Sequence, residues 1–432
     1  MTFLVLAALS HRRILAAETS RKAAHIAVGL VAVSFGWLFD ETLPVTLLSV
    51  GGMAFTIAMR MVPFLYRLVG PVVHSVGRRS FGDYCIPVVV PLLHWLAMPD
   101  TVMYVVPMLV LTLADSAAAL VGRRFGCWAY RTDDGSKTLE GSATVALMTG
   151  VIVLGALLLE GFGWQRAASL SLLMAILMML AEAVCWRGLD NLVLPLGSFV
   201  LLKTYETLPD QLIIERVLAS VVLTAFAMVW HRRAGMMGAA GVAAAFAIYA
   251  CWAIGGIVWA VQPLVLLVML PFLGVSRGDD GAHDIGVGPV LSMSSVPLMW
   301  LFLESAGAVD SAFLAFLSAW AAVLGVAWII RHRRAQTTDE GDRLLLLKVL
   351  LALAAMGVLA SELPRGTERP AITLALVLVS LLFAAGVEAL ADWRRRLGSG
   401  DLAWIARACI VLLASSATMA LSHLAGDLFR VA

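Results

Sequence analysis

Long apolar segments recur along the whole chain, and they constrain its fold more than any other feature. A segment of about 17–25 apolar residues crosses a bilayer as an α-helix, because a helix satisfies its backbone hydrogen bonds internally. Hydrophobic residues make up 61% of the 432 residues and charged residues only 14%, a balance that soluble domains rarely tolerate. The sequence therefore predicts an all-α, polytopic integral membrane protein with no room for a sizeable soluble domain.

The apolar segments predict about 15 transmembrane helices, with a range of about 14–16. The spans are expected at residues 23–39, 43–59, 83–98, 101–121, 139–159, 166–186, 190–205, 211–230, 235–254, 258–274, 287–304, 309–330, 344–360, 371–390 and 402–424. The apolar N-terminal segment has no basic stretch in front of it, so a short first helix is expected there rather than a cleavable signal peptide.

Lys and Arg are distributed unevenly among the loops. In membrane proteins these residues concentrate in cytoplasmic loops. With the expected spans the basic loops all fall on one side, and the opposite loops are short and weakly charged apart from residues 361–370. We therefore expect a multi-pass protein of the cell membrane whose loop 122–138 faces the cytoplasm. A change in loop composition near 205–235 predicts a first domain over 1–208 and a second over 209–432.

Several classes of protein are disfavoured by composition. The formal net charge is only +2 and no basic stretch is interleaved with aromatic residues, so no nucleic-acid partner is expected. The five cysteines are scattered without metal-ligand spacing, which argues against a disulfide framework and against zinc. The sequence leaves the oligomeric state open.

The most unusual polar stretch runs from 113 to 142. Asp115 lies inside a predicted span, where an acidic residue is costly and faces a polar cavity or a partner. Small residues share its helical face. Gly122 and Gly126 then flank Arg123 and Arg124, and this corner could offer backbone N–H groups to a phosphate.

The stretch ends where the next span begins. Lys137 and Glu140 lie one turn apart there, followed by Gly141 and Ser142. The N-terminus of a helix carries a positive partial charge and favours anions, including phosphate. Alternatively, these residues are a solvated loop and snorkelling cations.

Three further polar clusters lie on the same predicted cytoplasmic side. They comprise Arg21, Lys22 and His25; Ser80, Gly82 and Asp83; and Glu182, Asp190 and Asn191. Each has a simple structural explanation as a membrane anchor, a helix cap or a turn. Together they supply carboxylates and cations to one compartment, which is the chemistry of a metal-bound nucleotide: carboxylates for Mg²⁺, cations and backbone N–H groups for phosphate oxygens.

The motifs resemble a known family. Asp115-Ser-Ala-Ala-Ala-Leu-Val-Gly122-Arg-Arg-Phe-Gly126, followed by Lys137-Thr-Leu-Glu140-Gly-Ser142, is similar to the signature of the phytol kinase and dolichol kinase family, which includes nucleotide-dependent diacylglycerol kinases. The other three clusters fit the same family, in its order, over residues 18–200. Thr138 and Asp83 stand where Ser and Glu are common in the family. The family is also distantly similar to membrane cytidylyltransferases that make CDP-diacylglycerol.

The resemblance implies an integral membrane kinase with Mg²⁺ and with CTP, or another nucleoside triphosphate, as phosphate donor. The acceptor would be the hydroxyl of a membrane lipid alcohol: a polyprenol, a phytol-like isoprenoid or diacylglycerol. The expected catalytic residues are Asp115, Lys137, Glu140 and Asp190, with Asp115 and Asp190 as metal ligands. The expected nucleotide-binding residues are Arg21, Lys22, His25, Gly122, Arg123, Arg124, Gly126, Gly141, Ser142 and Asn191. Ser80, Gly82, Asp83 and Glu182 would support the site.

Two alternatives stay open at this point. A cytidylyltransferase acting on a lipid phosphate would use the same polar residues but release pyrophosphate. A transporter or lipid-binding membrane protein would need polar residues near the midplane of both halves. The second half weakly resembles a membrane family that includes phytyl-phosphate kinases. It lacks the Asp-Thr and Ser-Glu-Gly features expected there, so an auxiliary membrane domain is the preferred interpretation.

Overall fold

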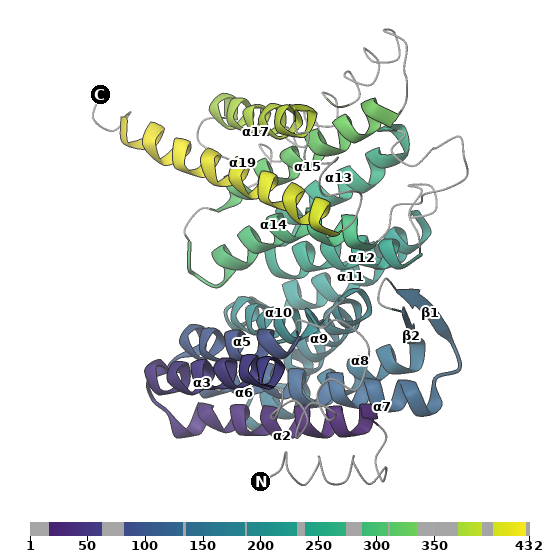
Figure 1. Cartoon of the computed structure of the whole chain (residues 1–432), viewed down its shortest axis with the longest axis vertical. Coiled ribbons are helices and arrows are strands. Elements are labelled where there is room, and N and C mark those ends of the chain that lie inside the picture. The colour runs from purple at the N-terminus through teal and green to yellow at the C-terminus, as the bar shows by residue number, and fades with distance from the viewer. Residues whose placement is uncertain are drawn as a thin grey trace. The chain divides into compact units, whose positions relative to one another are not determined.

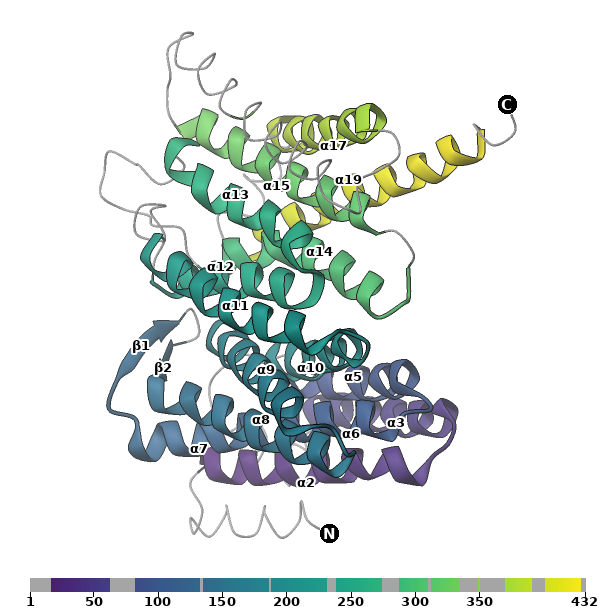
Figure 2. The same ribbon diagram turned by 180° about the vertical axis from the view of Figure 1, so that it is seen from behind.

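A computed structural model describes residues 17–62, 82–132, 135–185, 188–230, 238–273, 287–309, 312–334, 349, 370–390 and 401–428. These residues are mostly helical and include one two-stranded sheet. Packing divides the chain into two compact units, Met1–Val217 and Leu218–Ala432, and each is described by itself below. The helices of both units are drawn from two sides in Figure 1 and Figure 2.

Unit 1 is a bundle of apolar helices. Its described helices are α2 (Ala17–Leu38), α3 (Thr42–Met61), α5 (Gly82–Ala97), α6 (Thr101–Leu109), α7 (Asp115–Phe125), α8 (Leu139–Leu159), α9 (Trp164–Val184) and α10 (Asp190–Glu206). Helix α8 packs along both α7 and α9, and α2 packs along α6. Helix α11 (Asp210–Trp230) begins in this unit and ends in the next.

Two glycines let α2 lie close against α6 and the residues that follow it. A side chain at Gly29 would collide with Thr112, and one at Gly36 would come within 2.8 Å of the Tyr104 ring. Small residues allow such close packing of membrane helices. The Tyr104 hydroxyl also donates to the carbonyl of Ala32 at 2.7 Å. Because α2 is held in this register, its polar end lies beside the start of α7.

A π-helical turn, η1 (Val110–Ala114), joins α6 to α7, so that Thr101–Phe125 is one continuous helix. A π turn inserts an extra residue, is rare, and occurs often at functional sites. Here it immediately precedes Asp115 and therefore sets the direction in which that side chain points from the helix. Nothing in the sequence had indicated the π turn.

A β-hairpin precedes α8, where the sequence had suggested only a polar loop. Strands β1 (Ala129–Thr132) and β2 (Gly135–Thr138) pair antiparallel, with Ala129 opposite Thr138 and Tyr130 opposite Lys137. Thr138 ends β2 and also caps α8, since its hydroxyl accepts from the amide of Gly141 at 3.2 Å.

Unit 2 is a second helical bundle. Its described helices are α12 (Gly238–Ala250), which continues into the π turn η2 (Cys251–Gly255), then α13 (Ile257–Leu273), α14 (Val287–Ser305), α15 (Phe313–Arg334), α17 (Pro370–Leu390) and α19 (Asp401–Leu428). Helix α15 is central and packs against α14, α17 and α19. Buried aromatic rings of Trp259, Phe316 and Trp320 form part of the core.

The described residues hold fourteen helices when continuous segments are counted once. They coincide with fourteen of the expected spans; the remaining one, 344–360, lies outside the described residues except for Val349. In the described part of the chain, seven helices are long and apolar enough to cross a membrane, and four other apolar helices are shorter. An all-α, membrane-like protein is thus confirmed, whereas the number of fifteen transmembrane helices is not. The segment before Ala17, where a short first helix is expected, also lies outside the described residues.

Candidate active site

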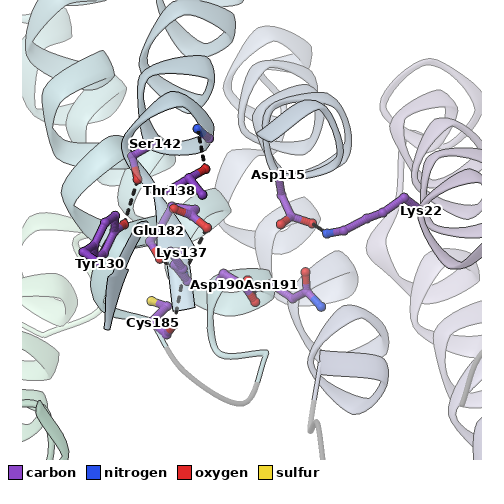
Figure 3. Close-up of polar contacts among 11 residues, drawn as sticks. Lys22, Asp115, Tyr130, Lys137, Thr138, Ser142, Glu182, Cys185, Asp190 and Asn191 are labelled. Carbon is purple, nitrogen blue, oxygen red and sulfur yellow. Dashed lines mark hydrogen bonds and ion pairs between the residues drawn. The ribbon is translucent and has the colours of Figure 1, made fainter. Parts of the chain in front are cut away.

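The first element of the site is a buried ion pair between α2 and α7. Lys22 Nζ donates to Asp115 Oδ2 at 2.6 Å, and each side chain is only 8% exposed. His25 Nε2 lies 3.7 Å from the same oxygen and 3.5 Å from the carbonyl oxygen of Leu111. A buried carboxylate is costly unless it is paired. The predicted proximity of these two clusters, 93 residues apart in the sequence, is what the structure shows (Figure 3).

The second element is an ion pair between the hairpin and the end of α9. Lys137 Nζ lies 3.0 Å from Glu182 Oε1, and it also donates to the carbonyl oxygens of Glu182 and Cys185. Carbonyls at a helix C-terminus carry partial negative charge. Burial by itself lowers the pKa of Lys137, but the negative charges of Glu182 and Asp190 outweigh burial and hold that pKa above its usual value. Lys137 is therefore a firmly charged ammonium group.

Asp190 lies between these two pairs (Figure 3). It begins α10, and its Oδ1 accepts from the amide of Asn191 at 2.9 Å. The charges of Asp115, Lys137 and Lys22 all act on it. Among the described residues, no cation lies within ion-pair distance of its carboxylate. Three carboxylates thus lie close to two ammonium groups, and the charge of Arg21 also acts on Asp115.

Glu140 and Ser142 face the hairpin. The Glu140 carboxylate accepts from the backbone amides of Cys127 at 2.8 Å and Trp128 at 3.2 Å. Ser142 shares a 2.8 Å hydrogen bond with the phenol of Tyr130. Burial raises the pKa of Tyr130, so this phenol stays protonated. These two predicted site residues therefore contact the segment that carries Lys137.

The predicted glycine corner is a packing contact between α7 and α8. A side chain at Gly122 would come within 2.7 Å of the Thr138 hydroxyl, and one at Gly141 within 3.2 Å of the carbonyl oxygen of Ala118. Gly126 ends α7 and donates to the carbonyl of Gly122. Tight packing by itself explains these glycines, so their phosphate-binding role stays a prediction.

The remaining predicted site residues belong to neither ion pair. Arg123 and Arg124 are exposed in the last turn of α7, with Arg124 over the Phe125 ring. Arg21 is half-buried and its charge acts on Asp115. In the predicted cluster of Ser80, Gly82 and Asp83, the last two residues begin α5, which packs against α10. Ser80 lies outside the described residues.

Two groups of the site were not predicted from the sequence: the carbonyl of Cys185 and the phenol of Tyr130. The Cys185 carbonyl is a backbone group with no sequence signal of its own. Tyr130 could have been found from the strand pairing, because residues opposite each other in an antiparallel hairpin share a face.

The carboxylates suit a metal that is held together with a nucleotide. Among the described residues no group of three or more His, Cys, Asp or Glu side chains could hold a metal alone. Mg²⁺ commonly takes one or two protein carboxylates and completes its shell with substrate phosphates and water. Asp115 and Asp190 would supply two such carboxylates, and the charge of Asp115 acts on Asp190.

The fold and the site define an all-α membrane protein with a buried, charged site formed by helix ends and a hairpin. A phytol kinase from Synechocystis sp. is 30% identical to the chain over 190 residues, which cover 42% of this chain and 77% of that protein. The chain therefore belongs to the phytol kinase family. No family model matches the chain, and no solved structure does.

Proposed function

We propose that the protein is an integral membrane kinase that transfers the terminal phosphate of a nucleoside triphosphate to the hydroxyl of a lipid alcohol. The observation that carries the proposal is the convergence of Lys22, Asp115, Lys137 and Asp190 from four separate segments. Phosphoryl transfer depends mainly on positioning and on neutralising phosphate charge. The name of the Synechocystis relative supports an isoprenoid alcohol as acceptor.

The roles follow from the chemistry of each group. Lys22 is buried and Lys137 is half-buried, and their ammonium groups would bind phosphate oxygens. Asp115 and Asp190 would hold Mg²⁺. When bound, this ion would neutralise phosphate charge. His25 lies beside Asp115 and would orient its carboxylate.

In the proposed reaction the lipid hydroxyl oxygen bonds to the terminal phosphorus in line with the bond that breaks. The bridging oxygen leaves on the nucleoside diphosphate. The proton of the lipid hydroxyl passes to a carboxylate of the site or to water. The product is a lipid monophosphate.

The finer parts of the proposal are the donor, the acceptor and the orientation. CTP is the proposed donor, since the family resemblance of the motifs implies it. A phytol-like isoprenoid or polyprenol is the first acceptor to test, and diacylglycerol the next. The excess of Lys and Arg in the loops on this side supports a site that faces the cytoplasm.

The test uses the purified full-length protein in lipid nanodiscs with Mg²⁺. CTP, ATP, GTP and UTP are each offered with phytol, a polyprenol and diacylglycerol, and the lipid and nucleotide products are identified. A lipid monophosphate with a nucleoside diphosphate supports the kinase. If a lipid phosphate and CTP instead yield a CDP-lipid and pyrophosphate, the protein is a cytidylyltransferase. Failure of every donor with every alcohol rejects the proposed kinase.

A further inference from the structure

Glu140 closes the base of the hairpin. Its Oε1 accepts from the amides of Cys127 and Trp128 at 2.8 and 3.2 Å, and its Oε2 lies 3.4 Å from the second amide. The same two stretches, before β1 and after β2, are also joined by the amide of Leu139, which donates to the carbonyl of Trp128 at 3.0 Å. The residues before β1 and those after β2 are therefore held together at one point.

A hairpin of this size depends on such anchors. Two isolated strands of four residues are marginally stable at best in water. Hydrogen bonds from backbone N–H groups to a carboxylate are charge-assisted and stronger than neutral ones. Glu140 also lies in the first turn of α8, where the helix dipole stabilises an acidic side chain. Its position thus favours a firm anchor.

The anchored hairpin carries Lys137 to its partners. Lys137 lies on β2, two residues before the start of α8, and its ammonium group reaches Glu182 and the C-terminal carbonyls of α9. Glu140 is not among the charges that act most strongly on Lys137, Asp115 or Asp190. Its carboxylate is engaged by backbone amides instead, so its influence on the site passes through the hairpin.

We infer that Glu140 is a positioning residue: it fixes the hairpin base so that Lys137 is held where the nucleotide phosphates would bind. The inference rests on the proposed kinase function. It separates Glu140 from Asp115 and Asp190, the two carboxylates to which metal binding is assigned.

The first experiment measures the anchor without any activity assay. Hydrogen exchange is followed by mass spectrometry on peptides that span 124–139 in the full-length protein, in Glu140→Ala and in Glu140→Gln. The alanine variant should exchange the Cys127 and Trp128 amides about tenfold faster, whereas glutamine keeps a carbonyl acceptor and should retain most protection. Glu160→Ala, an exposed residue at the other end of α8, is the matched control and should change nothing. Unchanged exchange in Glu140→Ala would overturn the inference.

The second experiment measures nucleotide kinetics. Glu140→Ala should raise the KM for the nucleotide about tenfold and lower kcat less, while Glu140→Gln should stay within about threefold of the unmodified protein. Adding Glu140→Ala to Lys137→Ala should cost nothing further, because residues that act through one group are not additive. A metal ligand would behave differently: Gln would be as damaging as Ala, and both would raise the Mg²⁺ requirement. That result would reject the positioning role.

The two experiments separate the possible failures. If the unmodified protein phosphorylates no lipid, the proposed function fails, and with it the positioning role in that reaction, whatever the exchange data show. If the protein is active and Glu140→Ala loses amide protection yet keeps its nucleotide KM, the hairpin anchor exists but does not position Lys137. In that case the proposed function stands and only the inference falls.

Discussion

Each of the two units buries an ion pair between helices, and the two pairs differ in how many other charged groups act on them. In unit 2, Arg407 of α19 binds Glu388 of α17, with Nη2 at 2.9 Å from Oε1 and Nε at 3.3 Å from both carboxylate oxygens. The Arg407 guanidinium also lies 4.3 Å from the centre of the Trp404 ring. Among the described residues, this is an ion pair of one cation with one carboxylate, 19 residues apart.

In unit 1, the Lys22–Asp115 pair joins residues 93 apart and is not self-contained. Asp190 adds a third carboxylate to it and to the Lys137–Glu182 pair. The difference teaches that a buried charge in a membrane helix does not by itself indicate function. A better indication of a ligand site is a cluster of several acids and cations that come from distant segments of the chain.

The largest expected effect comes from removing charge in unit 1. Asp115→Asn keeps the side-chain shape but removes the negative charge, so the rate of lipid phosphorylation should fall by about 10³-fold or more. The double variant Lys22→Met with Asp115→Leu should be equally inactive while still folded. Activity and thermal unfolding are measured together. Full activity in Asp115→Asn would show that this residue has no part in the mechanism. The claim that the buried charges of unit 1, unlike those of unit 2, form a ligand site would then fail.

The next effect is on stability, in unit 2. Glu388→Ala leaves Arg407 buried without its carboxylate, and breaking such a pair costs about 3–5 kcal/mol. Replacing both residues, with Glu388→Leu and Arg407→Met, should restore most of the loss, because a buried pair can be exchanged for apolar residues at little cost. Denaturant unfolding in detergent gives the free energies. The nucleotide KM of the double variant should stay unchanged; a raised KM would place this pair in the site after all.

A smaller effect is expected from the environment of Lys137. Glu182 raises the pKa of Lys137, so Glu182→Gln should lower that pKa, and Lys137 should lose its charge at a lower pH. The unmodified protein should therefore keep its nucleotide affinity to a higher pH than Glu182→Gln does. At neutral pH the KM should rise about three- to tenfold, because the ammonium group is less firmly held. Nucleotide KM measured from pH 7 to pH 10 checks both points. Coincident pH profiles would show that Lys137 does not bind the nucleotide.

The helices were predictable because hydrophobic segment length determines which stretches form membrane helices. The expected span 139–159 coincides with α8, and 190–205 differs from α10 by one residue. The polar clusters were also predictable as groups, since charge inside an apolar chain is costly and must be compensated. Which acid meets which cation was not predictable: it depends on the π turn before Asp115 and on the hairpin that presents Lys137. Likewise the Glu388–Arg407 pair went unnoticed, because each residue lies near a helix end and resembles an ordinary interfacial charge.

The smallest expected effect concerns Tyr130, and it tests whether Ser142 belongs to the anchor or to the nucleotide site. Tyr130→Phe removes one hydrogen bond, worth about 1 kcal/mol, so the nucleotide KM should rise no more than about fivefold. If Ser142 acts only by holding Tyr130, Ser142→Ala should have the same effect and the double variant should be no worse than either. If Ser142 binds phosphate, as the sequence predicts, its alanine variant should raise the KM further and add to Tyr130→Phe. Additive effects would therefore place Ser142 with the groups that bind the nucleotide, and non-additive effects would place it with the hairpin anchor, beside Glu140.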